Sequence, residues 1–218
     1  MTSKYFKYGQ KELNHLKSKD KKLAEIIDKI GMIEREVIPD LFEGLIHTII
    51  GQQISTKAAA SIWKKMKSSI PDLTPEIIAE YKPEKLQKIG ISFRKVEYMQ
   101  SACEKILNKS LNLYDLKDMN DKKVCTELTK LRGIGVWSAE MIMIFSMQRQ
   151  NILSYGDLGI HRGLRMLYHH RSINTAHFKK YWCRYSPYSS VASLYLWEIA
   201  GGAVPEMKDY APKQTKRK

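Results

Sequence analysis

The feature that most constrains this chain is a short glycine-containing turn between two strongly helical patterns, within residues 131–157. Before the turn, apolar residues recur at the i, i+4, i+7 spacing of one helical face, and the same spacing returns after it. The turn reads Gly133-Ile134-Gly135, which leaves room only for a tight reversal of the chain. The pattern therefore predicts two helices joined by a hairpin.

The second glycine opens the second predicted helix, so the amides of Gly135, Val136 and Trp137 are expected to point outward at a helix N-terminus. Such a terminus suits a phosphate group. The simpler alternative is an αα-hairpin whose glycines serve only as a helix cap and a turn. A net charge of +14 favours phosphate binding over this alternative. The lone carboxylate of Asp157, just beyond the second helix, makes the combination of hairpin and acid a specific one.

The rest of the chain is also helical in its spacing, and no segment alternates with the period of two that a strand requires. The predicted fold class is therefore all-α. Residues 21–30 form a helix that Gly31 stops, Pro39 is placed in the first turn of a helix that ends near Gly51, and a last helix is expected over residues 187–200. Residues 1–20 and 212–218 are polar and are expected to be flexible, apart from one or two helical turns around residues 10–17.

Charge and composition limit the classes of partner and site. The net charge of +14 indicates a polyanion, and DNA, RNA or an acidic membrane surface would each fit it. No stretch approaches the roughly 20 apolar residues that span a bilayer, and the lysine-rich N-terminus lacks the apolar run of a secretory signal. The three cysteines are far apart, and no histidine pair has metal-ligand spacing. We expect an intracellular protein without a disulfide framework or a catalytic metal.

Four segments, in consistent order between about residues 41 and 201, resemble one family. Residues 131–157 are similar to the helix-hairpin-helix and Gly/Pro-Asp signature of the DNA glycosylase superfamily. Their details resemble its alkyladenine branch, the bacterial 3-methyladenine DNA glycosylase II group and its yeast relatives. The three other matching segments are Ile50-Gly51-Gln52-Gln53-Ile54-Ser55, Gly90-Ile91-Ser92 with Lys95 close behind, and Tyr188-Ser189-Ser190-Val191-Ala192 leading to Tyr195-Leu196-Trp197.

The resemblance implies a single catalytic core over residues 1–218, made of two helical subdomains with a central cleft. A middle subdomain of about residues 55–150 would contain the hairpin, and the N- and C-terminal helices would form the other. It also implies a monomer that binds double-stranded DNA containing damaged bases, in a bacterial cytoplasm or a eukaryotic nucleus. No cofactor is implied beyond a monovalent cation held by hairpin carbonyls of residues 131–136 when DNA is bound.

Asp157 matches the catalytic carboxylate of this family. Cleavage of the C1′–N bond of a nucleotide passes through a cationic sugar, which a carboxylate stabilises while it orients or deprotonates a water molecule. From the sequence alone, the default role of Asp157 is to cap a helix over residues 158–168. The two roles are compatible, because a helix N-terminus favours the ionised carboxylate.

The remaining site residues also follow from the resemblance. Trp137 stands where bifunctional members carry the lysine that forms a Schiff base, so this chain is predicted to use water instead. Trp137 and Trp197 match aromatic residues of the base pocket, where an electron-rich ring can face a cationic alkylated purine, and core packing is the alternative for both. Gln53 matches the wedge that replaces the extruded nucleotide, although larger bacterial members have an apolar residue there. The other residues assigned to DNA binding are Gln52, Gly133, Ile134, Gly135, Val136 and Ser138.

Two other functions stay open at this point. A non-catalytic helix-hairpin-helix module explains the charge and the glycines but leaves Asp157, Trp137 and the two adjacent glutamines without a role. A glycosylase of the same fold that acts on oxidised or mismatched bases explains every feature except Trp137 and the missing cysteine cluster. The preferred prediction is a monofunctional DNA glycosylase that flips out and hydrolytically excises alkylated, 3-methyladenine-type purines in base excision repair.

Overall fold

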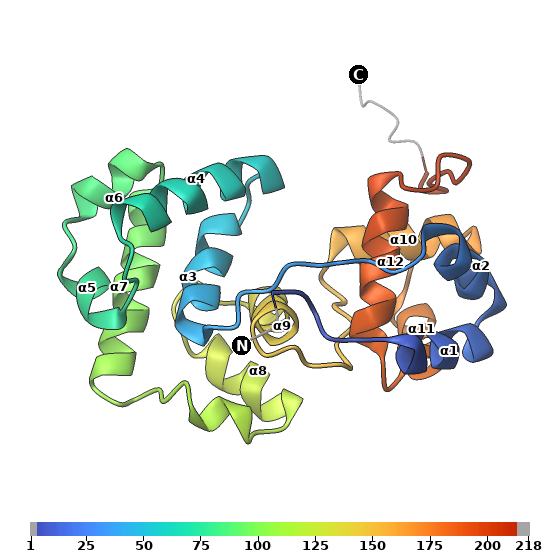
Figure 1. Ribbon diagram of the computed structural model, residues 1–218, viewed down its shortest axis with the longest axis horizontal. Helices are drawn as coiled ribbons and strands as arrows, with labels where there is room; N and C mark the ends of the chain where they lie inside the picture. Colours follow the sequence, from blue (N-terminus) through green and yellow to red (C-terminus); the bar gives the residue numbers. More distant parts are fainter. Residues whose placement is uncertain (1–3, 213–218) are drawn as a thin grey trace. The chain divides into compact units, whose positions relative to one another are not determined.

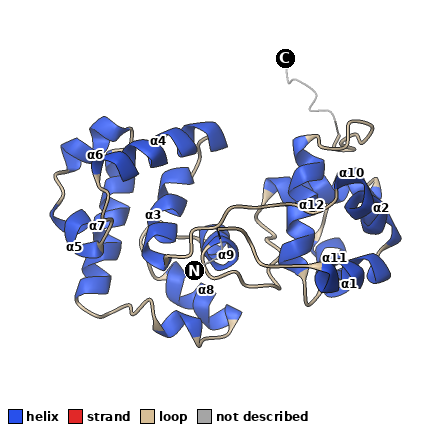
Figure 2. Cartoon of the chain, in the orientation of Figure 1, coloured by secondary structure: helices blue, strands red, loops and turns tan. Residues whose placement is uncertain are grey.

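The computed structural model describes residues 4–212, and throughout this range the chain is built from helices and connecting loops (Figures 1 and 2). An isolated β-bridge between Tyr5 and Glu36 is the only β pairing in these residues, so the all-α prediction is confirmed. The helices are α1 Gln10–Lys19, α2 Lys21–Ile30, α3 Leu41–Gly51, α4 Thr56–Ser69, α5 Pro75–Glu80, α6 Pro83–Ile89, α7 Phe93–Leu107, the 3₁₀ helix η1 Asp115–Lys117, α8 Asp121–Thr129, α9 Val136–Phe145, α10 Leu158–Tyr168, α11 Thr175–Tyr185 and α12 Ser189–Gly201.

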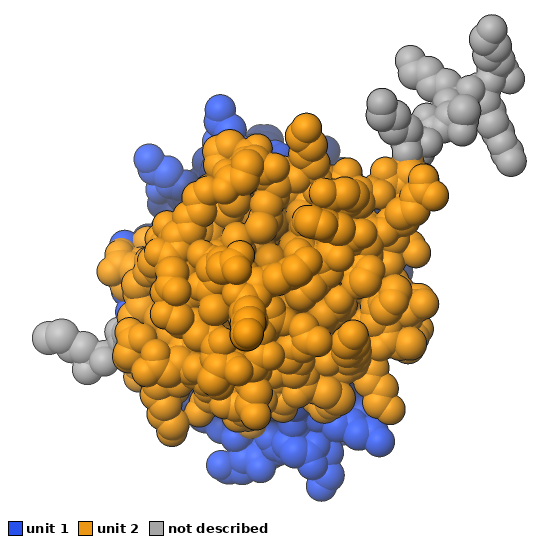
Figure 3. All heavy atoms as spheres, turned by 90° about the vertical axis from the view of Figure 1, so that its right-hand side faces the viewer, with its two compact units in different colours: residues 1–4, 37–148 blue, residues 5–36, 149–218 orange. Residues whose placement is uncertain are grey.

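The chain divides into two compact units, coloured separately in Figure 3. Of the described residues, unit 1 comprises residue 4 and residues 37–148, and unit 2 comprises residues 5–36 and 149–212. The sequence placed the start of the middle subdomain near residue 55, but α3 also belongs to unit 1. The physical reason is packing, because α3 lies against α4, α7 and α9.

Helix α9 is largely buried within unit 1. It is apolar on nearly all sides, as expected of a helix surrounded by others, and it packs against both α8 and α3. Gly44 of α3 lies against the end of α9, where an added Cβ would come within 2.8 Å of the Cβ of Ser146. This close approach anchors the second helix of the predicted hairpin in the core of the unit.

Helices α10 and α12 form the centre of unit 2. Their contact is unusually close at Gly163 of α10, where an added Cβ would lie 2.9 Å from the carbonyl carbon of Leu196 and still nearer its oxygen. Helix α12 is buried along most of its length, and α1 and α11 pack against it. The absence of a side chain at Gly163 therefore lets the backbone of α10 approach the backbone of α12 directly.

The expectation that residues 1–20 are flexible is wrong for residues 10–19, which form the whole of helix α1 rather than one or two turns. Glu12 accepts a hydrogen bond from the amide of Gly9 at 2.8 Å and so caps the helix, while Leu13 and Leu16 are buried. Two apolar residues among many polar ones gave too weak a periodic pattern to predict more than one or two turns there. It is stabilised by its contacts with α2, α11 and α12.

Two helix starts also differ from the prediction. Helix α3 begins at Leu41 rather than in the turn containing Pro39, because the side chain of Asp40 accepts a hydrogen bond from the amide of Glu43 at 2.8 Å and caps the helix there. Helix α12 begins at Ser189 instead of residue 187. The expected flexible tail at residues 213–218, like residues 1–3, lies outside the described range. Within that range no helix is long and apolar enough to cross a membrane.

Two histidines are expected to make the stability of the fold depend on pH. Burial lowers the pKa of His47 in α3, and burial together with His177, Lys180 and Lys22 lowers the pKa of His170. The unfolded chain therefore takes up more protons than the folded chain as the pH falls through about 6.5. We expect the urea midpoint of unfolding to fall between pH 7.5 and pH 5.5. The decrease should be smaller in the variant His47→Gln/His170→Gln, and an equal decrease would show that other groups cause it.

Candidate functional site

The hairpin that joins α8 to α9 needs glycine at its first position. Gly133 has φ +82°, in the left-handed region, and an added Cβ would overlap the ring of Tyr98, with Cγ and Cε2 at 2.5 Å and Cδ2 nearer still. Gly135 differs, because its backbone is extended (φ −91°, ψ 177°) and an added Cβ would have no atom of the protein within 4 Å. The surface beside Gly135 is therefore open to an approaching group.

The hairpin presents backbone rather than side chains. The first helical hydrogen bond at the start of α9 runs from the amide of Ala139 to the carbonyl of Gly135, at 3.0 Å. The amides of Val136 and Ser138 precede it, in the first turn, where no helical carbonyl is available. Ile134 is buried in the core, whereas Val136 is exposed. The expected arrangement of an outward-facing helix N-terminus is present.

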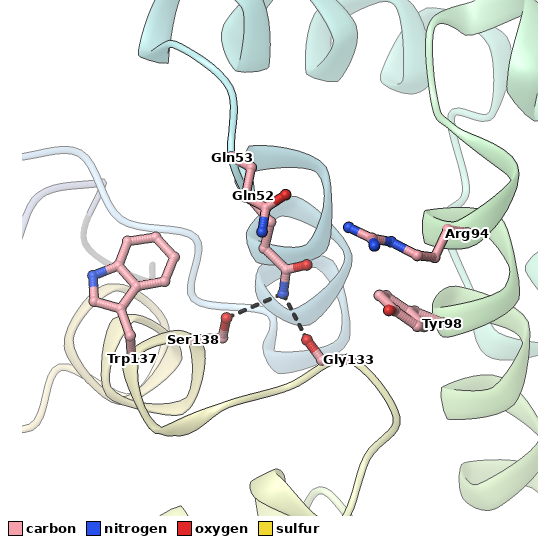
Figure 4. A pocket seen from close by; sticks show the side chains of 7 residues that line it. All are labelled: Gln52, Gln53, Arg94, Tyr98, Gly133, Trp137 and Ser138. Atoms are coloured by element: carbon pink, nitrogen blue, oxygen red, sulfur yellow. Dashed lines mark hydrogen bonds between the residues drawn. The ribbon is translucent and has the colours of Figure 1, made fainter. Parts of the chain in front are cut away.

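Gln52 links the end of α3 to the hairpin. Its side-chain amide donates hydrogen bonds to the carbonyl of Gly133 at 2.9 Å and to the hydroxyl of Ser138 at 3.1 Å (Figure 4). Ser138 itself is buried. These contacts give the side chains of Gln52 and Ser138 a structural function, which is to hold the hairpin in its conformation.

Lys95 of α7 fixes the same end of α3. Its Nζ donates to the carbonyls of Ile50 and Gln52, both at 2.7 Å, and so closes the C-terminus of α3. Burial and the neighbouring Arg94 lower the pKa of Lys95. Lys95, which closely follows Gly90-Ile91-Ser92 in the sequence, therefore helps to position the two glutamines that follow α3.

An open depression of about 430 Å³ lies between these elements in unit 1. Trp137 lies on one side of the Gln52 side chain, and Arg94 and Tyr98 lie on the other (Figure 4). Gln53 lines the same depression with a left-handed backbone (φ +55°), a conformation that costs a residue with a side chain about 1 kcal/mol or more. Sequence reasoning missed Arg94 and Tyr98, although both follow the Gly90-Ile91-Ser92 motif along α7.

Asp157 lies at the start of α10 in unit 2 and is 8% exposed. A turn before it is closed by a hydrogen bond from its amide to the carbonyl of Ser154, at 3.3 Å. Its Oδ1 accepts hydrogen bonds from the amide of Ile160 at 2.9 Å and from the indole Nε1 of Trp197 at 3.0 Å. The helix-capping interpretation is thus confirmed as a contact, and the catalytic function of this carboxylate stays a prediction.

The two tryptophans assigned to the base pocket belong to different units. Trp137 is half-buried at the start of α9 and lines the depression of unit 1. Trp197 is half-buried on α12 and contacts Asp157. Neither ring lies fully in a core, which was the alternative for both. Among the described residues, no three His, Cys, Asp or Glu side chains gather in a way that could hold a metal ion.

Comparison with known proteins matches this chain to one protein family. Residues 46–182 match the family described as "HhH-GPD superfamily base excision DNA repair protein". A curated relative, DNA-3-methyladenine glycosylase 1 of Schizosaccharomyces pombe, is 30% identical over 169 residues, which are 73% of this chain and 72% of the relative. The matched range includes the hairpin, both glutamines and Asp157.

Solved structures agree with the sequence comparison. A crystal structure of a DNA-3-methyladenine glycosidase from Bacillus halodurans is 32% identical, with a TM-score of 0.80 over 95% of this chain and 97% of that one. The S. pombe 3-methyladenine DNA glycosylase in complex with abasic DNA is 26% identical, with a TM-score of 0.79 over 88% of this chain and 97% of that one.

Proposed function

Because this chain belongs to the HhH-GPD superfamily of base excision DNA repair proteins, we propose that it is a monofunctional DNA glycosylase that hydrolytically excises alkylated, 3-methyladenine-type purines. Relatives matched over most of its length carry names of that activity. The single observation that carries the proposal on this chain is the buried carboxylate of Asp157, fixed by two donors at the start of α10.

In this proposal, unit 1 contains the residues that bind the DNA backbone. The first-turn amides of α9 have no helical carbonyl to bind, and the open side of Gly135 would let a phosphate approach them closely. A net charge of +14 adds sequence-independent attraction to the backbone. Gln53 extends from a strained turn beside this hairpin, which supports its assignment as the wedge that fills the space left by a flipped nucleotide.

Unit 2 supplies the carboxylate. As the C1′–N bond breaks, its electron pair leaves with the base nitrogen and positive charge develops on the sugar. The ionised carboxylate of Asp157 stabilises that charge, and it orients a water molecule whose oxygen forms the new bond to C1′ and whose proton the carboxylate accepts. An alkylated purine already carries positive charge, so it leaves without a separate acid, and a tryptophan ring can face it favourably.

The hairpin carbonyls fit the monovalent cation that the resemblance implies. The carbonyls of Leu131 and Gly133 each accept one hydrogen bond, from the amide of Ile134 and from Gln52, and each keeps a second lone pair. Residues 131–136 would hold the ion, which would add positive charge beside a bound phosphate.

We expect borohydride to trap no covalent complex between this protein and damaged DNA. Trp137 has no amine, so it cannot form the Schiff base that reduction would fix. Lys95 has a lowered pKa, but its Nζ is engaged by two carbonyls. The measurement is a gel shift under denaturing conditions after reduction, with a bifunctional glycosylase as positive control. A trapped species that maps to any lysine would contradict monofunctional chemistry.

Gly135→Ala should weaken binding to DNA about tenfold while leaving the fold intact. The added methyl group meets no atom of the protein, and the backbone conformation is allowed for alanine. It would, however, occupy the surface where a phosphate approaches the α9 amides. Fluorescence anisotropy with an undamaged duplex measures the affinity, and thermal melting checks the fold. Unchanged affinity would mean that the hairpin does not contact the phosphate.

Release of free base from a panel of duplexes tests the proposed function. Under single-turnover conditions, the protein should release methylated purines and leave oxidised and mismatched bases in place. Release of oxidised or mismatched bases instead would establish the alternative specificity. Binding without release of any base would establish a non-catalytic helix-hairpin-helix module.

A further inference from the structure

The carboxylate of Asp157 is held by two different helices of unit 2. The amide of Ile160, from the first turn of α10, and the indole N–H of Trp197, from α12, both donate to Oδ1, at 2.9 Å and 3.0 Å. A single capping bond leaves a carboxylate able to rotate about its last side-chain torsion. A second donor from another direction removes that freedom, because the torsion must satisfy both.

The approach of Trp197 depends on an absent side chain. An added Cβ at Gly159 would lie 2.8 Å from Cδ1 of Trp197, 3.1 Å from Oδ1 of Asp157 and 3.3 Å from Nε1 of Trp197. Gly163 lies four residues later on the same face of α10, and there the backbone of α12 approaches α10 just as closely. Glycine is not needed for its backbone at Gly159, which lies in the first turn of a helix with ordinary dihedral angles.

We propose that Trp197 and Gly159 are positioning residues for Asp157: the indole N–H orients the carboxylate, and the missing side chain of Gly159 leaves the indole room to do so. This inference rests on the proposed function, in which Asp157 stabilises the developing sugar cation. It gives Trp197 a function beyond that of a wall of the base pocket. A preorganised charge stabilises a transition state only where its geometry is fixed before the reaction, so loss of the orienting bond should slow the chemical step.

Replacement of the indole N–H alone tests this function. Trp197→benzothienylalanine keeps the size and stacking surface of the ring but puts sulfur in place of N–H. We expect single-turnover release of a methylated purine to slow about 10- to 100-fold, the effect of a lost hydrogen bond to a charged group. Affinity for a duplex containing an abasic analogue should not change. Either of two results would overturn the proposal. The variant could release the base at the rate of the parent protein, or it could lose affinity for the duplex while its rate of release stays that of the parent.

Two comparisons separate orientation from a general effect on the protein. The same replacement at Trp182, which is partly exposed on α11, should leave excision at the parental rate. In the Asp157→Asn background, Trp197→benzothienylalanine should cause no further loss, because no carboxylate charge is left to orient. If the two effects multiply instead, the ring acts independently of Asp157 and the proposal is wrong.

Gly159→Ala tests the space beside the indole. We expect excision to slow about tenfold or more, because the new Cβ would displace the indole from Asp157. Thermal melting checks the fold, since the better helix propensity of alanine, up to about 1 kcal/mol, offsets part of the cost of this displacement. Combining it with Trp197→Phe, which has a smaller ring and no N–H, should give a protein no slower than Trp197→Phe alone. A further loss in the double variant would mean that Gly159 acts by another route.

The same experiments distinguish failure of this inference from failure of the proposed function. If Asp157→Asn excises at the parental rate, Asp157 is not catalytic and both ideas fall. If Asp157→Asn is inactive while Trp197→benzothienylalanine and Gly159→Ala are both fully active, only the positioning function is wrong.

Discussion

Asp157→Asn should slow base release by about 10²–10³-fold. The variant keeps the size of the side chain and the oxygen that accepts the amide of Ile160, so the cap of α10 survives. What it loses is the negative charge that, in the proposed function, stabilises the cationic sugar. A single preorganised group of this kind contributes about 3–4 kcal/mol to a transition state, which corresponds to that range of rates.

Affinity for DNA should not fall with this substitution and should rise slightly, because the substitution removes a negative charge that, in the proposed function, lies close to the phosphates of bound DNA. The measurement pairs single-turnover excision of an alkylated purine with a titration of an abasic-analogue duplex. Asp40→Asn is a matched control, since Asp40 caps α3 through the same kind of bond to the amide of Glu43. If Asp157→Asn releases the base at the rate of the parent protein, Asp157 serves only as a helix cap.

Gly163→Ala should destabilise the protein by about 1–3 kcal/mol, or more if α12 cannot move. The new Cβ would lie 2.9 Å from the carbonyl carbon of Leu196, and its obstacle is backbone rather than a flexible side chain. Alanine gains up to about 1 kcal/mol in helix propensity over glycine, which offsets only part of this cost. For a protein of this size, each kcal/mol lowers the melting temperature by about 2–4 °C.

Gly201→Ala is the control for this experiment. Gly201 ends α12, and an added Cβ there would meet no atom within 4 Å, so its effect should stay within about 0.5 kcal/mol. Both variants are compared by thermal melting at one pH. If Gly163→Ala melts with the parent, α10 and α12 do not approach as closely as the structure has them.

The hairpin shows how much of the site local sequence can determine. The glycine spacing predicted a turn and a helix N-terminus, and the structure has both, because short-range sterics decide a left-handed turn at Gly133 regardless of what surrounds it. The function of Gln52 could not be predicted in this way. Its side chain reaches Gly133 and Ser138 across more than 80 positions of sequence, and only the packing of α3 against α9 brings them together.

The sequence by itself determined the all-α class, the hairpin, the placement of Asp157 at a helix start and the family to which those motifs belong, since each depends on residues close together in the chain. Only the tertiary structure decided that residues 10–19 are helical, that α3 belongs to unit 1, and that Trp197 donates to Asp157 through the gap left by Gly159. The physical reason is the same in each case. These features are stabilised by burial and contact between segments distant in sequence, and such contacts leave no periodic pattern in either segment alone.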